Sequence, residues 1–250
     1  MNNKNNPIIY VSLFGVITAI TLNVPGGFYF LYPFMILGTW FHEFSHGMMA
    51  LLLGGNFHQL VIFPDGSGYA QFSYSSLFLG NIGNALVAAA GPIGPTIIGN
   101  VLMISSMNEK ATKIMMYLLG IIMLISTIMW VRPFISFGFG FSVLFSILFL
   151  YIATKGSIKI QRLSLQFIAV QAFMSLYLSI GYLFSQGAVV GGERNMSDTE
   201  VMADNLFLPY WFWAVLIIAF SVYSIIKSIL FIIKKSDTSS ISNYNSQKVI

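Results

Sequence analysis

The hydrophobic residues of this chain fall into seven long apolar runs that are separated by short polar breaks. The runs lie at about 8–24, 29–54, 77–105, 114–131, 134–154, 163–186 and 206–233. Each is close to the roughly 20 residues that a helix needs to cross a bilayer. We therefore expect an all-α polytopic membrane protein with about seven transmembrane helices.

Two of the breaks between runs carry specific signals. Arg132 and Pro133 are the only interruption in an apolar stretch that is too long for one crossing, and we interpret them as a tight turn. No small-residue cleavage site follows the first run before Pro25, so we expect this run to be retained as an anchor rather than removed as a signal peptide.

Between the second and third runs the pattern changes to one that is typical of β-structure. Residues 57–63 and 69–74 are β-prone and flank the turn residues Pro64 to Gly68. We expect a membrane-associated β-hairpin at about 57–75. Residues 1–233 then form one transmembrane domain, and 234–250, which are polar and rich in Ser and Asn, form a flexible tail.

Composition supports a membrane protein and excludes other classes. The chain is 56% hydrophobic and only 8% charged, with a mean hydropathy of +0.79, which excludes soluble globular and disordered proteins. The 12 Lys and Arg residues lie scattered in short loops and form no stripe for nucleic acid. Because the chain has no cysteine, catalysis has to use oxygen, nitrogen or a metal held by His and carboxylate.

The positions of the cations bear on orientation. With seven spans, the loops at 106–113 and 155–162 share a side with the tail. Together with Lys227 near the end of the last span they hold nine Lys and Arg, whereas the other side holds Lys4, Arg132 and Arg194. The positive-inside rule then places the N-terminus outside and the tail in the cytoplasm. If the chain has one span more or fewer, every loop after that span moves to the opposite side of the membrane. The distribution of cations therefore leaves the orientation open.

The second apolar run contains His42, Glu43 and His46 in the pattern His-Glu-x-x-His. On a helix the two histidines lie on one face and can bind one ion, while Glu43 is turned by about 100° and can address a water molecule on that ion. A charged group in mid-membrane costs about 2.5–3.5 kcal/mol, which disfavours a chance occurrence. The pattern predicts Zn²⁺ on His42 and His46, with Glu43 as general base; the alternative is two histidines hydrogen-bonded to neighbouring helices.

A catalytic zinc ion usually has three protein ligands, so a third has to come from elsewhere. Position 52 is Leu rather than the His of one soluble-protease pattern, and the later apolar runs contain no glutamate. The remaining candidates are His58, Asp65, Glu193, Asp198, Glu200 and Asp204. Asp65 also fits an ordinary turn, and Ser197 or Asp198 also fits a helix cap, so the pattern leaves the third ligand open.

Residues 80–99 are rich in Gly and Ala and include Pro92 and Pro95. One interpretation is close packing against another helix. The other is a kinked wall beside the metal, which makes room for water or substrate.

Three features together resemble the site-2 proteases, zinc metalloproteases that cut their substrates within the membrane. These features are the His-Glu-x-x-His helix, the β-hairpin after it, and Ala90-Gly91-Pro92 in the next helix. Residues 39–70 are especially similar to a small site-2-protease-like branch of membrane metallopeptidases. By this resemblance the hairpin lies on the cytoplasmic side, which is the opposite of what the positive-inside rule gives.

The resemblance implies a role for each site residue. His42 and His46 would bind zinc, and Glu43 would be the catalytic base. The segment at Ser197 resembles the corresponding segment of the smaller branch, which makes Asp198 the third ligand, with Asp204 second. The Leu-Asp-Gly motif of the better-known members is absent here, and Pro95 stands where many members have Asn.

We therefore expect a zinc-dependent intramembrane metalloprotease of the cell membrane. It would hydrolyse a peptide bond in a membrane-embedded or membrane-adjacent protein or peptide, and the hairpin edge would pair with an unwound substrate segment. One alternative is a catalytically silent binding or regulatory protein that retains the fold. A metal transporter is less favoured, because nearly all polar ligands sit on one span.

Overall fold

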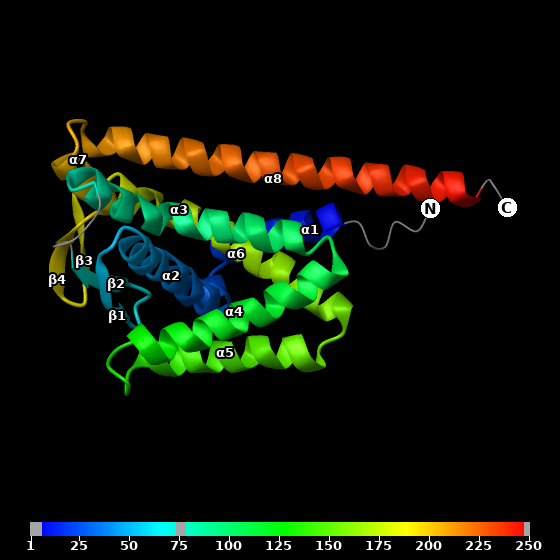
Figure 1. The fold of residues 1–250 in the computed structure, drawn as a ribbon, viewed down its shortest axis with the longest axis horizontal. Coiled ribbons are helices and arrows are strands. Elements are labelled where there is room, and N and C mark those ends of the chain that lie inside the picture. The colour runs from blue at the N-terminus through cyan, green and yellow to red at the C-terminus, as the bar shows by residue number, and fades with distance from the viewer. Residues whose placement is uncertain (1–6, 74–78, 248–250) are drawn as a thin grey trace.

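The computed structural model describes residues 7–73 and 79–247 and consists mainly of long helices (Figure 1). The helices are α1 (Pro7–Asn23), α2 (Gly27–Leu52), α3 (Asn81–Ser105), α4 (Glu109–Trp130), α5 (Phe137–Lys155), α6 (Ile158–Leu183), α7 (Asp198–Asn205) and α8 (Tyr210–Gln247). The strands β1 (Asn56–Ile62) and β2 (Gly68–Ser73) form one antiparallel hairpin, and β3 (Gly187–Val190) and β4 (Glu193–Met196) form a second. Apart from α7, each helix coincides with a predicted apolar run, which confirms the polytopic all-α fold.

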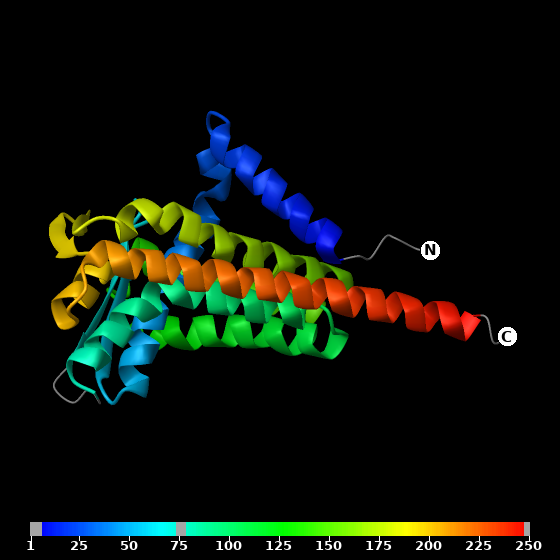
Figure 2. The same cartoon turned by 90° about the horizontal axis from the view of Figure 1, so that it is seen from above.

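The first two helices form a sharply bent pair, which counts as at most one crossing by length and composition. Ile9–Asn23 and Gly27–Leu52 meet at a bend of 119°, which Figure 2 shows. Pro25 has no N–H with which to continue a helix, and Gly26 adopts the left-handed φ of 80°. Within the described residues, five helices are long and apolar enough to cross a membrane, or up to six crossings if the bent pair is one span, instead of the predicted seven.

The number of crossings decides whether the two ends of the chain lie on the same side of the membrane or on opposite sides. α1 begins at the end of the bundle toward which α8 runs (Figures 1 and 2). The seven-span interpretation had placed the N-terminus and the tail on opposite sides. The physical reason for the difference is the bend, because α1 and α2 together count as at most one crossing rather than two.

Short, capped connections join the helices that lie along the long axis of the bundle. Asn108, Ser136 and Ser157 cap α4, α5 and α6 by accepting a hydrogen bond from a backbone N–H three residues later, at 3.1, 3.1 and 3.4 Å. The break at Arg132 and Pro133 is a turn between α4 and α5, as predicted. These connections keep neighbouring helices antiparallel.

Both hairpins and α7 gather at one end of the bundle (Figure 1). The β1–β2 hairpin confirms the predicted one; its predicted ends at 74 and 75, and the predicted start of the third span at 77, lie outside the described residues. The β3–β4 hairpin was not predicted. The backbone N–H of Arg132 donates to the buried Leu60 at 3.0 Å, so the α4–α5 turn anchors β1.

The core surrounds the middle of α2, where Ile36, Leu37, Trp40 and Phe41 are at most 1% exposed. In contrast, α8 exposes large apolar side chains, Val215 and Leu230 among them, as a helix facing lipid does. Its backbone is helical to Gln247, and the division into a transmembrane domain and a tail from 234 onwards stays a prediction. Because the middle of α2 is buried by the other helices, its polar residues Glu43 and His46 lie inside the bundle rather than against lipid.

Candidate metal centre

The two histidines of α2 point at a common position. His42 and His46 lie one helical turn apart, and their Nε2 atoms are 3.1 Å from each other. His46 is buried and His42 is partly buried. Two ring nitrogens facing each other at this distance repel if both carry lone pairs, so the pair favours a cation between them.

A hydrogen bond on the far side of His46 fixes which nitrogen is free. Its Nδ1 lies 2.7 Å from the backbone carbonyl of Val87 in α3. Because a carbonyl oxygen only accepts, Nδ1 carries a proton, and in the neutral ring Nε2 then has the lone pair that a metal ion needs. A backbone carbonyl in this position orients a metal-binding histidine in the same way in known metal sites.

Asp198 brings a carboxylate to the same position, although it lies 152 residues after His46 and 156 residues after His42 in the sequence. Its Oδ2 is 3.0 Å from His42 Nε2, and its Oδ1 is 3.2 Å from His46 Nε2. Burial opposes its ionisation, but the adjacent His46 and His42 outweigh burial and hold the pKa of this carboxyl below its ordinary value. Asp198 is therefore a charged group inside the protein.

The start of α7 holds Asp198 in place. The Oγ of Ser197 caps the helix by accepting from the Glu200 N–H at 3.2 Å, and it donates to the carbonyl of Ser185. Thr199 donates to the carbonyl of Leu183 at 2.7 Å. The sequence left open whether this segment caps a helix or meets the histidines. In the structure Ser197 caps α7 and Asp198 meets the histidines.

The three groups fit a zinc ion. Zinc–ligand distances of about 2.0–2.2 Å in a tetrahedron separate ligand atoms by roughly 3.3–3.6 Å, and the observed separations of 3.0, 3.1 and 3.2 Å are close to this range. Asp198 Oδ2 is buried and accepts no hydrogen bond within the described residues, although His42 Nε2 is so near. Two imidazole nitrogens and a carboxylate that converge on one position are the ligand set that a zinc ion takes.

α3 closes the site on one side. A Cβ on Gly91 would overlap the Nε2 atoms of His46 and His42, and a Cβ on Gly94 would overlap Ser45. These contacts support the close-packing interpretation of the Gly-rich segment, whereas no residue of α3 lines the cavity.

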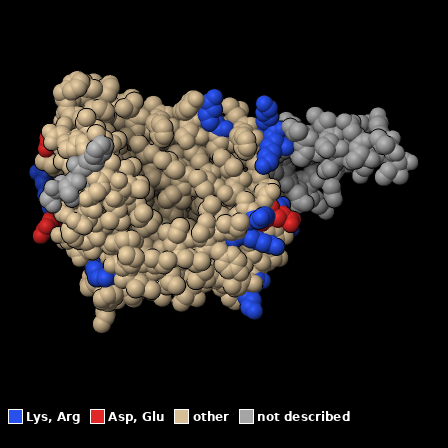
Figure 3. Space-filling view, viewed as in Figure 1, with Lys and Arg blue, Asp and Glu red and all other residues tan. Residues whose placement is uncertain are grey.

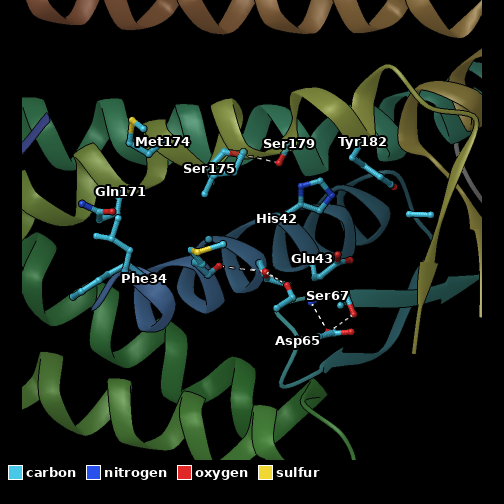
Figure 4. A pocket seen from close by; sticks show the side chains of 18 of the residues that line it. Phe34, His42, Glu43, Asp65, Ser67, Gln171, Met174, Ser175, Ser179 and Tyr182 are labelled. Atoms are coloured by element: carbon cyan, nitrogen blue, oxygen red, sulfur yellow. Dashed lines mark hydrogen bonds between the residues drawn. The ribbon is translucent and has the colours of Figure 1, made fainter. Parts of the chain in front are cut away.

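Glu43 lies beside His42, and both line a cavity of about 310 Å³ (Figure 4). The side chain is 8% exposed and is hydrogen-bonded to the backbone of Ala70 in β2. The walls of the cavity come from α1, α2, α6, the 65–68 turn and β3. Glu43 and His42 both line it, so a molecule in the cavity can reach the base and the site together.

The other candidate ligands lie elsewhere. Asp65 accepts hydrogen bonds from the Ser67 hydroxyl at 2.7 Å and N–H at 2.9 Å, which lower its pKa and make it a turn residue. His58 and Asp204 are exposed. Among the described residues, His42, His46 and Asp198 are the group of three that could hold a metal ion.

Sequence reasoning did not single out Tyr182, near the end of α6, which also lines the cavity. Its hydroxyl accepts a hydrogen bond from the backbone N–H of Asp198 at 3.2 Å. A tyrosine near the end of an apolar run is common at membrane interfaces, so the pattern carried no signal for a place in this site.

Comparison with known protein families gives a match along most of the chain. Residues 12–228 match the family described as Peptidase M50B-like. The matched range includes α2, α3 and α7, which supply the convergent groups and their wall. No curated protein and no solved structure matches significantly.

Proposed function

The chain belongs to the Peptidase M50B-like family, which is the site-2 protease family of intramembrane metallopeptidases, and from this premise we propose that it is a zinc-dependent intramembrane protease. The observation that carries the proposal is the convergence of His42, His46 and Asp198 beside Glu43. The helices that are long and apolar enough to cross a membrane support a multi-pass location in the membrane. Its substrates are proposed to be membrane-embedded or membrane-adjacent proteins or peptides.

In this proposal His42, His46 and Asp198 hold the zinc ion. Bound zinc supplies Lewis acidity toward a water molecule and toward the carbonyl of the bond to be cut. Glu43 accepts the proton that water loses as its oxygen bonds to the carbonyl carbon. Glu43 then delivers that proton to the nitrogen as the C–N bond breaks, so the carboxylate is regenerated at the end of each cycle.

The surroundings support a substrate in an extended conformation. A helix hides its carbonyl groups in its own hydrogen bonds, so the segment to be cut has to unwind before water can attack. β2 is at an edge of its two-stranded sheet, and Gly68 at its start lines the cavity. An unwound segment in the cavity would lie beside a strand with which it can pair.

The proposal is tested by reconstituting the protein in liposomes with a pool of synthetic single-span peptides and detecting new termini by mass spectrometry. We expect cleavage by the wild type and by Glu193→Gln, which changes an exposed glutamate in β4. Glu43→Gln should keep the zinc and lose cleavage, since Gln preserves size but cannot take the proton. Zinc binding without any cleavage by the wild type would instead indicate a silent binding protein.

A further inference from the structure

Tyr182 lies next to the proposed zinc ligands and Glu43, but the proposed mechanism gives it no role. It extends from α6 toward the start of α7, beside His42 (Figure 4). Its ring centroid is 6.5 Å from that of His42, and both residues line the cavity with Glu43. Any carbonyl group that reaches Glu43 and His42 through the cavity therefore comes close to the phenol.

The hydroxyl of Tyr182 still has a proton to donate. It accepts the backbone N–H of Asp198, which belongs to the first turn of α7 and has no partner within that helix. A phenol can accept and donate at once, and within the described residues its O–H meets no acceptor. Accepting from an amide polarises the hydroxyl and makes its O–H a stronger donor.

We propose that Tyr182 is a further catalytic residue, whose O–H donates a hydrogen bond to the carbonyl oxygen of the bond being cut. When the oxygen of water bonds to the carbonyl carbon, an electron pair moves to that carbonyl oxygen, and the phenol stabilises the negative charge. The proton stays on Tyr182 throughout, while Glu43 takes the proton of water. This role rests on the proposed peptidase function.

A purely structural role of Tyr182 predicts different effects when its hydroxyl is removed. If the phenol only ties α6 to α7, its loss would loosen Asp198 and would therefore weaken zinc binding. If the phenol stabilises the developing charge, its loss would slow the chemical step and leave the zinc site intact. Zinc affinity and kcat thus separate the two roles.

The test compares Tyr182→Phe with Tyr177→Phe, a matched change on the same helix at a side chain that is 61% exposed. With the peptide that the wild type cleaves fastest, we expect Tyr182→Phe to lower kcat by about 10²-fold, as loss of one donor to an oxyanion does, with KM and zinc affinity unchanged. Tyr177→Phe should match the wild type. A phosphonamidate version of the same peptide, which carries charged tetrahedral oxygens, should bind more weakly to zinc-loaded Tyr182→Phe by calorimetry.

Three results would overturn the assignment. Undiminished kcat in Tyr182→Phe would remove the role, as would unchanged phosphonamidate binding. A rate loss that excess zinc restores would make Tyr182 a support for Asp198. If the wild type cleaves nothing, the proposed function fails and the role of Tyr182 fails with it. Normal cleavage by Glu43→Gln would remove only the role of Glu43 as base, and normal cleavage by Tyr182→Phe alone leaves the peptidase proposal standing.

Discussion

Each zinc ligand proposed here is a single side chain with no substitute nearby. We expect His42→Ala and His46→Ala each to abolish stoichiometric zinc binding, because the remaining two groups cannot be supplemented within the described residues. His58→Ala, which removes an exposed imidazole in β1, should keep the metal. Metal analysis of the purified variants decides, and full zinc content in both α2 variants would exclude the site.

Asp198 can be tested without disturbing the helix that it begins, because the capping hydrogen bond belongs to Ser197. Loss of a residue that only hydrogen-bonds to a metal ligand typically lowers metal affinity by roughly 10–100-fold. Asp198 is proposed to bind the metal itself, so Asp198→Asn should weaken zinc binding by more than that. Asp204→Asn and Asp65→Asn should leave affinity unchanged. A larger loss at Asp204 in a zinc titration would transfer the role to that residue.

At the scale of elements, the site depends on how closely α3 approaches α2. Helix propensity alone predicts that Gly→Ala inside a helix stabilises it by about 1 kcal/mol. At Gly91 the added methyl would meet both imidazoles, so we expect Gly91→Ala to weaken zinc binding strongly. Gly181→Ala in α6, where a Cβ would meet nothing within 4 Å, is the control and should bind zinc normally. Equal affinity in the two variants would show that the contact is unimportant.

The elements also show what the sequence could and could not predict. Apolar run length located every long helix, and Pro64 to Gly68 located the first hairpin, because both signals are local. The bend at Pro25 was taken for a connection between two crossings, since periodicity carries no information on the angle between helices. The β3–β4 hairpin has strands of only 4 residues, too short for a pattern to stand out.

The site was predictable only in part for a related reason. His42, Glu43 and His46 are recognisable because their spacing on one helix is local. Spacing could not choose Asp198 over other acidic residues, and only the resemblance to site-2 proteases did so. Tyr182 reaches the site through the contact between α6 and α7, which no local pattern encodes.

At the scale of the whole molecule, positive charge is concentrated at one end (Figure 3). The described cations toward that end are Lys110, Lys113, Lys155, Lys159, Arg162, Lys227, Lys234 and Lys235. The other end, with the hairpins and the metal centre, has Arg132 and Arg194. The positive-inside rule applied to this arrangement places the basic end in the cytoplasm and the metal centre toward the outside.

The absence of native cysteine makes this orientation directly testable. In right-side-out vesicles, a membrane-impermeant maleimide should label Glu193→Cys in β4. Glu109→Cys at the start of α4 should be labelled only after the vesicles are opened. Both side chains are exposed in the protein, so burial does not explain a difference. The reverse labelling would support the orientation that the site-2 protease resemblance implies.

The central claim is that peptide hydrolysis depends on one zinc ion held by His42, His46 and Asp198. The most direct measurement is a zinc titration of metal-free protein in liposomes, with bound zinc and peptide cleavage followed in the same samples. Cleavage should rise in proportion to bound zinc and stop rising at one ion per chain. Cleavage by the metal-free protein, or a chain that is saturated with zinc and cleaves nothing, would contradict the account.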